Sequence, residues 1–170
     1  DGVGGNAMRR LLLDTNIYGL LFTDRDFHKM HALVEGSSLI AVYGFDVIRR
    51  ELKAAPSNVI GGVNVRAALL RAYSGFVKKE YSIEPRLVEL ANLYHKYYTS
   101  FGGSISYNIL KNDFLIVACA STHEIPIVVS EDRATMLNEL SLRSYSKVNT
   151  LKGLKNLSFI SYEKFKNELE

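Results

Sequence analysis

Two short apolar runs, each leading into a carboxylate, constrain the fold of this chain more than any other feature of its sequence. Leu11-Leu12-Leu13 is followed directly by Asp14, and Ile127-Val128-Val129 ends three residues before Asp132. Runs this short without a polar residue are typical of strands buried on both faces of a sheet. Segments of helical periodicity lie between them. We therefore expect right-handed crossovers and an α/β fold, with a central, mostly parallel sheet flanked by helices.

The expected elements belong to one domain. A length of 170 residues and a hydrophobic content of 47% suit a single domain with a substantial core. We expect it to span residues 8–170, and residues 1–7, which lack periodicity, to be a leader or the remnant of a tag. Strands are expected at 9–14, 39–43, 126–130 and 157–161, helices at 15–22, 26–35, 65–78, 85–99, 133–142 and 162–169, two further helices around Glu51 and Asp113, and a loop or hinge at 56–64.

Four carboxylates fall where the surrounding pattern is apolar. Asp14 and Asp132 follow expected strands, while Asp113 and Glu51 each share a helix face with apolar residues. Desolvating an ionised carboxylate costs several kcal/mol, which is large beside a domain stability of roughly 5–15 kcal/mol. Each acid alone is more often a helix cap, a rim residue or half of a salt bridge. Because four of them coincide, a divalent cation is the simplest compensation.

The order and setting of these acids resemble a known family. The motifs are Leu-Leu-Leu-Asp-Thr-Asn16, the mid-chain helical Glu51, Asn112-Asp113-Phe-Leu-Ile-Val-Ala118 and Val-Val-Ser-Glu-Asp132. Together they resemble the PIN-domain ribonucleases, which include the VapC toxins, over nearly all of residues 9–161. The resemblance implies a single PIN-like domain and a nuclease that hydrolyses the phosphodiester bonds of RNA.

The resemblance also implies a site, a cofactor and partners. Asp14, Glu51, Asp113 and Asp132 would be catalytic and would bind Mg²⁺ or Mn²⁺, because oxygen ligands without His or Cys suit these ions. Asn16 and Ser130 would support them. A homodimer is expected, and an antitoxin protein would be the partner if the chain is a toxin.

Several alternatives remain open at this stage. Many family members have a further acid two residues after the fourth, where this chain has Ala134, and Glu131 would replace Asp132 if the strand register shifted by one. The main alternative function is a catalytically inactive PIN-like scaffold that binds RNA or protein. A haloacid-dehalogenase-type phosphatase needs an acid where Asn16 stands, a receiver domain needs an adjacent acidic pair, and no glycine-rich phosphate loop occurs.

Composition adds little to the choice of function. A net charge of +3 permits a polyanionic partner without requiring one. A lone cysteine, Cys119, cannot form an internal disulfide, and no signal peptide or long apolar span is visible, so we expect a cytoplasmic protein with no membrane segment.

Some residues suggest RNA contacts, but each has a simpler structural interpretation. The basic candidates, each more often a solvated charge, are Arg49, Arg50, Lys111 and Arg133. Tyr94 and Tyr98 could stack on bases but share a helix face and would more often pack a core or a dimer interface. His28 and His31 are more typical of a surface helix than of a metal site.

Overall fold

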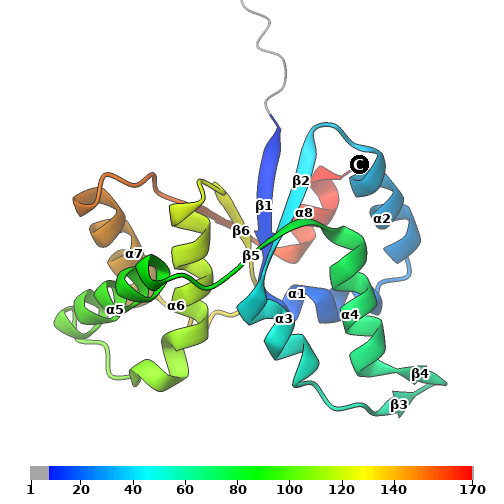
Figure 1. Ribbon diagram of the computed structural model, residues 1–170, viewed down its shortest axis with the longest axis horizontal. Helices are drawn as coiled ribbons and strands as arrows, with labels where there is room; N and C mark the ends of the chain where they lie inside the picture. Colours follow the sequence, from blue (N-terminus) through cyan, green and yellow to red (C-terminus); the bar gives the residue numbers. More distant parts are fainter. Residues whose placement is uncertain (1–7, 170) are drawn as a thin grey trace, which may run out of the picture.

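A five-stranded parallel sheet forms the centre of the molecule (Figure 1). The structure is a computed structural model that describes residues 8–169, so the expected leader, residues 1–7, lies outside the described part. The strand order is β5-β2-β1-β6-β7, and every neighbouring pair is parallel. The α/β class and the parallel sheet predicted from the sequence are confirmed. The strands are β1 Arg9–Leu13, β2 Ile40–Phe45, β5 Val77–Tyr81, β6 Ile127–Val129 and β7 Ser158–Ile160.

Helices cover both faces of this sheet. Figure 1 shows α5, α6 and α7 on one side and α1 to α4 with α8 on the other. No described helix is long and apolar enough to cross a membrane. The helices are α1 Thr15–Phe22, α2 Phe27–Gly36, α3 Asp46–Lys53, α4 Val65–Phe76, α5 Pro85–Ser100, α6 Tyr107–Thr122, α7 Glu139–Leu151 and α8 Tyr162–Glu168.

The central position of β1 explains the apolar run that ends it, Leu11 to Leu13. Leu12 and Leu13 are fully buried, with Leu12 paired to Tyr43 on one side and Leu13 to Val129 on the other. A strand with neighbours on both edges and helices on both faces buries its central side chains, while Arg9 and Arg10 at its start stay partly exposed. The ladder continues for one more residue, because the Asp14 amide donates to the Val129 carbonyl at 2.9 Å. Asp14 is thus fixed at the carboxyl edge of the sheet.

The segment expected to be a loop at 56–64 contains a small hairpin. Strands β3 Val59–Ile60 and β4 Val63–Asn64 pair antiparallel. Gly61 and Gly62 form the turn with φ of 56° and 81°. Two consecutive residues with positive φ make the tight turn that suits the twist of a hairpin, and glycine adopts it without strain.

Two predicted helices have the wrong bounds. The helix expected at 65–78 ends at Phe76, and the residues after it form β5, an edge strand. Exposed Lys78 and Lys79 suit such an edge, because charged side chains discourage pairing with another chain. The helix expected at 133–142 begins only at Glu139, because Asn138 caps it by accepting from the Leu140 amide, and it continues to Leu151.

Candidate active site

Asp14 is the most buried of the four predicted site acids, with 3% of its surface exposed. It is the N-cap of α1, because its Oδ1 accepts from the Thr15 amide at 2.8 Å. Its Oδ2 accepts from the Ser130 hydroxyl at 2.7 Å. Ser130 follows β6, and its own hydroxyl oxygen accepts from the Asp132 amide at 3.1 Å. The residues after β1 and β6 are therefore joined through side chains at the same edge of the sheet.

Thr135 connects the other two aspartates. Its hydroxyl lies 2.5 Å from Asp132 Oδ2 and also within hydrogen-bond distance of Asp113 Oδ2, although Asp113 comes from α6. The Thr135 amide donates to Asp132 Oδ1 at 3.0 Å, so the segment after β6 turns back on itself. This turn brings the carboxylate after β6 to the carboxylate of α6.

Glu51 reaches the site from α3. Its Oε1 accepts from the Thr15 hydroxyl at 2.8 Å, and the Asn112 side chain also hydrogen-bonds it. Thr15 is adjacent to Asp14, and Asn112 is adjacent to Asp113. Glu51 therefore bridges the start of α1 and the middle of α6.

The four acids interact electrostatically. Burial first, and then repulsion by Asp14, Asp132 and Glu51, raise the pKa of Asp113 to about 7 against the hydrogen bond from Thr135. Burial also raises the pKa of Asp14 to about 6, although the bonds from Ser130 and Thr15 oppose it. The pKa of Glu51 is raised too, chiefly by burial. The site is a region of poorly compensated negative charge.

These carboxylates accept hydrogen bonds from hydroxyl and amide groups. Within residues 8–169, no lysine or arginine forms an ion pair with any of the four acids. Nor do three His, Cys, Asp or Glu side chains in that range stand close enough together, as placed, to coordinate one ion. Mg²⁺ is nevertheless usually held by one or two carboxylates, with waters and phosphate oxygens completing its shell. The donor chemistry of the four acids therefore fits a hard divalent cation.

The alternatives left open by the sequence can now be placed. Glu131 is directed to α8, where its Oε1 accepts from the Tyr162 amide at 2.7 Å, so it does not take the place of Asp132. Asn16 lies in the first turn of α1 and is exposed. Asp14, not Asn16, caps that helix. Ala134 is exposed beside the site.

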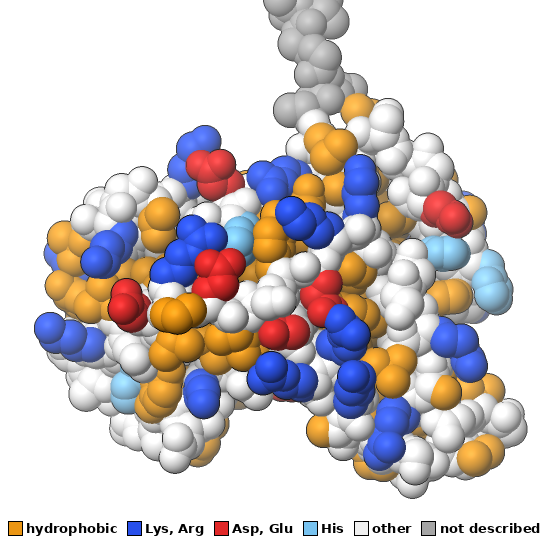
Figure 2. Space-filling model, viewed as in Figure 1, with side chains coloured by type: hydrophobic (Ala, Val, Ile, Leu, Met, Phe, Trp, Pro, Cys, Tyr) orange, Lys and Arg blue, Asp and Glu red, His pale blue; other side chains and the backbone are white. Residues whose placement is uncertain are grey.

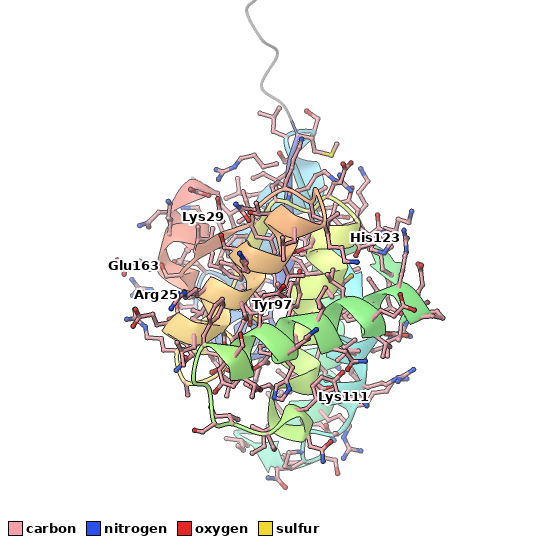
Figure 3. All side chains as sticks on the ribbon, turned by 90° about the vertical axis from the view of Figure 1, so that its left-hand side faces the viewer. Arg25, Lys29, Tyr97, Lys111, His123 and Glu163 are labelled. Carbon is pink, nitrogen blue, oxygen red and sulfur yellow. The ribbon has the colours of Figure 1, made fainter. Side chains whose placement is uncertain are left out.

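The basic candidates differ in their surroundings. Arg49 is paired with Glu80 through two hydrogen bonds, which removes it from the site. Arg50 is 68% exposed and 3.6 Å from Asp46. Lys111 is exposed on α6 (Figure 3). Arg133 is also exposed. In the space-filling view a hollow opens between the two groups of helices, and lysine and arginine side chains gather on its rim (Figure 2).

The tyrosines and histidines singled out in the sequence are structural in this arrangement. Tyr94 is fully buried and donates to Asn149 at 2.6 Å, while Tyr98 is 2% exposed, so both belong to the core. His31 contacts the Gly75 carbonyl at 3.0 Å. Neither His31 nor His28 joins a group of three metal-ligating side chains within the described range.

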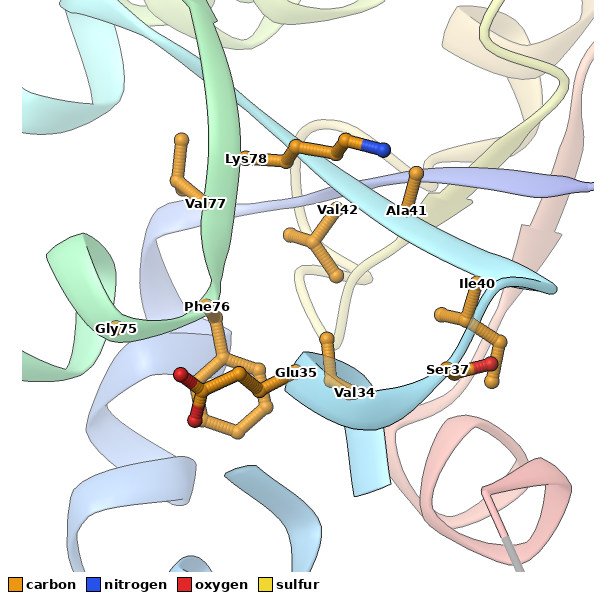
Figure 4. A pocket seen from close by; sticks show the side chains of 10 residues that line it. All are labelled: Val34, Glu35, Ser37, Ile40, Ala41, Val42, Gly75, Phe76, Val77 and Lys78. Atoms are coloured by element: carbon orange, nitrogen blue, oxygen red, sulfur yellow. The ribbon is translucent and has the colours of Figure 1, made fainter. Parts of the chain in front are cut away.

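A cavity at the opposite end of the sheet is separate from this site. It measures about 270 Å³ and opens where β2 and β5 begin, with Glu35 and Lys78 at its lining (Figure 4). The carboxylates stand where β1 and β6 end. Because the strands are parallel, the cavity lies at the amino-terminal ends of the strands and the carboxylates lie at their carboxyl-terminal ends.

Solved structures resemble this chain over most of its length. VapBC2 from Rickettsia felis, bound to a DNA fragment from their promoter, contains a chain with a TM-score of 0.57 and 13% identity, covering 89% of this chain and 97% of its own. FitAB bound to an IR36 DNA fragment gives 0.56 and 13%, covering 89% and 94%. DNA-bound VapBC from Salmonella typhimurium gives 0.54 and 10%, covering 91% and 99%. The chain has the PIN-like fold.

The PIN-like fold is what the solved structures share with this chain at such low identity. No family model matches the sequence, and no curated protein matches it either. The PIN-like fold predicted from the order of four short motifs is confirmed, whereas the chemistry of the acids rests on the geometry described above.

Two residues of the site were not found by sequence reasoning. Thr15 and Thr135 each hydrogen-bond an acid that comes from another element. Thr15 stands inside the Asp-Thr-Asn motif but was not assigned a role. Thr135 has no sequence signal of its own. The sequence predicts a helix at 133–142 there, whereas the structure has a turn that brings Thr135 to Asp113.

Proposed function

We propose that this chain is a divalent-metal-dependent ribonuclease whose site consists of Asp14, Glu51, Asp113 and Asp132. The observation that carries the proposal is the convergence of four carboxylates at one edge of the sheet without an ion pair among the described residues. Burial and mutual repulsion raise the pKa of Asp113 to about 7, which is unfavourable unless something neutralises the charge. A Mg²⁺ or Mn²⁺ ion would do so.

The side chains divide the work of phosphodiester hydrolysis. Asp14 and Asp113 would hold the cation, because the Ser130 and Thr135 hydroxyls restrict their orientations, and Asp132 would complete the set. Glu51, which is held by Thr15, would orient the attacking water or hold a second ion. When bound, a divalent cation supplies the charge that stabilises the phosphorane-like transition state and favours ionisation of water.

Cleavage of a mixed single-stranded RNA tests this proposal. Purified protein is incubated with Mg²⁺, Mn²⁺ or EDTA beside the Asp14→Asn and Asp113→Asn variants. We expect metal-dependent cutting that falls by roughly 10²-fold or more in both variants. Glu89→Gln, which removes an exposed carboxylate on α5, is the matched control and should cut like the wild type. Equal cutting by all four proteins would indicate contamination and would contradict the proposal.

We also propose that the chain is the toxin of a toxin–antitoxin pair, with an antitoxin as partner and a homodimer as its assembled state. The support is the likeness to VapBC and FitAB chains over about nine-tenths of this chain. Co-expression with the product of the neighbouring gene tests it. We expect the two proteins to co-purify, growth arrest to occur only without the partner, and light scattering to give twice the chain mass. Full growth without any partner would contradict the toxin assignment.

One observation favours a second candidate, a PIN-like scaffold that binds RNA or protein without cutting. Within residues 8–169, no three potential ligands lie close enough to hold an ion as placed. The two candidates differ in metal binding: a nuclease would bind Mn²⁺ through Asp113, while a scaffold would bind RNA equally well with or without the ion. Titration of Mn²⁺ into wild type and Asp113→Asn separates them.

A further inference from the structure

A pocket between α3 and α6 opens beside the carboxylates. It measures about 270 Å³, near the lower limit of the roughly 300–1,000 Å³ typical of small-molecule sites. Its apolar lining comes from Val47 of α3, Leu115 of α6 and Ile83 of the segment between β5 and α5. Val47 and Leu115 are nearly fully buried, so these walls are fixed by the core. The pocket is preformed and has an apolar interior.

The polar residues of the pocket lie toward the site and at the mouth. Glu51 lines the pocket and belongs to the four-carboxylate site, so the pocket adjoins that site. Among the described residues that line the pocket, Asn112 alone is neutral and polar, and it hydrogen-bonds Glu51. Arg50 and Lys111 are exposed at opposite walls, one from each helix. Apolar walls with two flanking cations complement a planar group that carries phosphates on either side.

We propose that this pocket receives the base of an unpaired ribonucleotide next to the phosphate that is cleaved. The inference rests on the ribonuclease function proposed above, because it names the substrate of the same site. Arg50 and Lys111 contact the phosphates, Val47, Ile83 and Leu115 contact the faces of the base, and Asn112 can hydrogen-bond its edge. A base can enter a pocket of this kind only when it is out of its stack, so the substrate is single-stranded RNA.

Binding measured without cleavage tests the pocket directly. The probe is a short fluorescein-labelled single-stranded RNA in EDTA, followed by anisotropy. Ala54 is exposed at the pocket, so Ala54→Phe should fill the space, with Ala32→Phe on α2 as the matched control. We expect Ala54→Phe to weaken binding by roughly tenfold, as for the loss of one stacked base, and Ala32→Phe to bind like the wild type. Thermal melting confirms that both variants fold.

The charge at the mouth is tested in the same assay. Lys111→Glu should weaken binding by roughly tenfold and reduce the dependence of log affinity on log salt by about one. Lys147→Glu changes the same charge at an exposed position on α7 that lines no described cavity. It should leave the salt dependence nearly unchanged, because counterions are released only where phosphate is contacted.

An abasic oligonucleotide distinguishes the base from the backbone. If the pocket holds a base, Ala54→Phe and wild type bind the abasic chain equally, and an RNA duplex binds the wild type more weakly than its single strand. Wild-type affinity in Ala54→Phe, or duplex binding as tight as single-strand binding, would overturn the inference. If the protein still cleaves RNA in a metal-dependent way after such a result, the ribonuclease proposal is retained and only the pocket is rejected. Pocket-dependent binding without metal-dependent cleavage supports the pocket and rejects the ribonuclease.

Discussion

At the scale of single residues, the site makes the metal-free protein less stable as pH rises. The pKa of Asp113 is about 7 and that of Asp14 about 6, against an ordinary value of 3.8, mainly because both are buried. The folded state therefore binds more protons than the unfolded state between these values. Stability is fully present below the unfolded pKa and is lost as pH rises from about 4 to about 7.

Removing the charge at position 113 should remove much of this pH dependence. In EDTA at about pH 8, we expect Asp113→Asn to be more stable than the wild type by roughly 2 kcal/mol, because no ionised carboxylate is buried there. Urea unfolding at several pH values measures it, with Glu89→Gln as the control for loss of an exposed carboxylate. If the unfolding free energy of the variant depends on pH as strongly as that of the wild type, Asp113 is not the carboxyl whose raised pKa causes this dependence.

The Thr135 hydroxyl should matter in a different way. Thr135→Val keeps the shape but leaves Asp113 and Asp132 without their common partner, so we expect a loss of about 1–2 kcal/mol in unfolding free energy and weaker Mn²⁺ binding. Thr135→Ser retains the hydroxyl and should restore both. Calorimetric titration with Mn²⁺ and urea unfolding measure the two effects. Equal Mn²⁺ affinity in the Val and Ser variants would show that the hydroxyl does not position the acids.

At the scale of elements, the sequence predicted strands and helices best where a local signal decides them. Buried strands β1 and β6 and the helices carrying Glu51 and Asp113 were placed by continuous or periodic apolar residues. Strand β5 was missed because Val77-Lys-Lys-Glu-Tyr81 is polar and becomes a strand only by pairing with β2. Edge pairing is a tertiary effect that local propensity does not contain.

The site shows the same division between local and tertiary information. Asp14 and Ser130 could be predicted because each follows a recognisable strand, and parallel strands end at one edge of a sheet. The role of Thr135 could not, because it depends on a turn at residues 133–137 and on a contact across 22 residues to Asp113. Short polar residues in turns carry no periodicity that would identify them.

Two glycines in different elements should respond oppositely to alanine. At Gly44 in β2, an added Cβ would lie 2.8 Å from both Tyr73 Cζ and Val77 Cγ1, so we expect a loss of about 2–3 kcal/mol. At Gly19 in α1, nothing lies within 4 Å of that position, and alanine should stabilise the helix by about 0.5–1 kcal/mol. Urea unfolding of both variants tests the close packing of α4 and β5 on β2; destabilisation of equal size at both positions would argue against it.

At the scale of the whole molecule, metal binding should couple to global stability. The acids come from the junction between β1 and α1, from α3, from α6 and from the segment after β6, so an ion held between them would join both groups of helices across the sheet. At about 100 times its dissociation constant, Mn²⁺ should add roughly 2.7 kcal/mol to the unfolding free energy.

Thermal melting with and without Mn²⁺ measures this coupling. The melting temperature of the wild type should rise, and that of Asp14→Asn or Asp113→Asn should rise much less. K⁺ at the same ionic strength controls for screening of surface charges. An equal increase in the wild type and both variants would place the ion elsewhere on the protein.

The double role of Asp14 has a consequence for how such a protein can change over generations. Its carboxylate both belongs to the acidic cluster and caps α1. Asparagine is as good an N-cap as aspartate, and the two are separated by a single-base change in their codons. A descendant could thus lose the carboxylate at this position while keeping its helix and its fold. Relatives that keep the fold but lack this carboxylate should therefore arise readily during evolution.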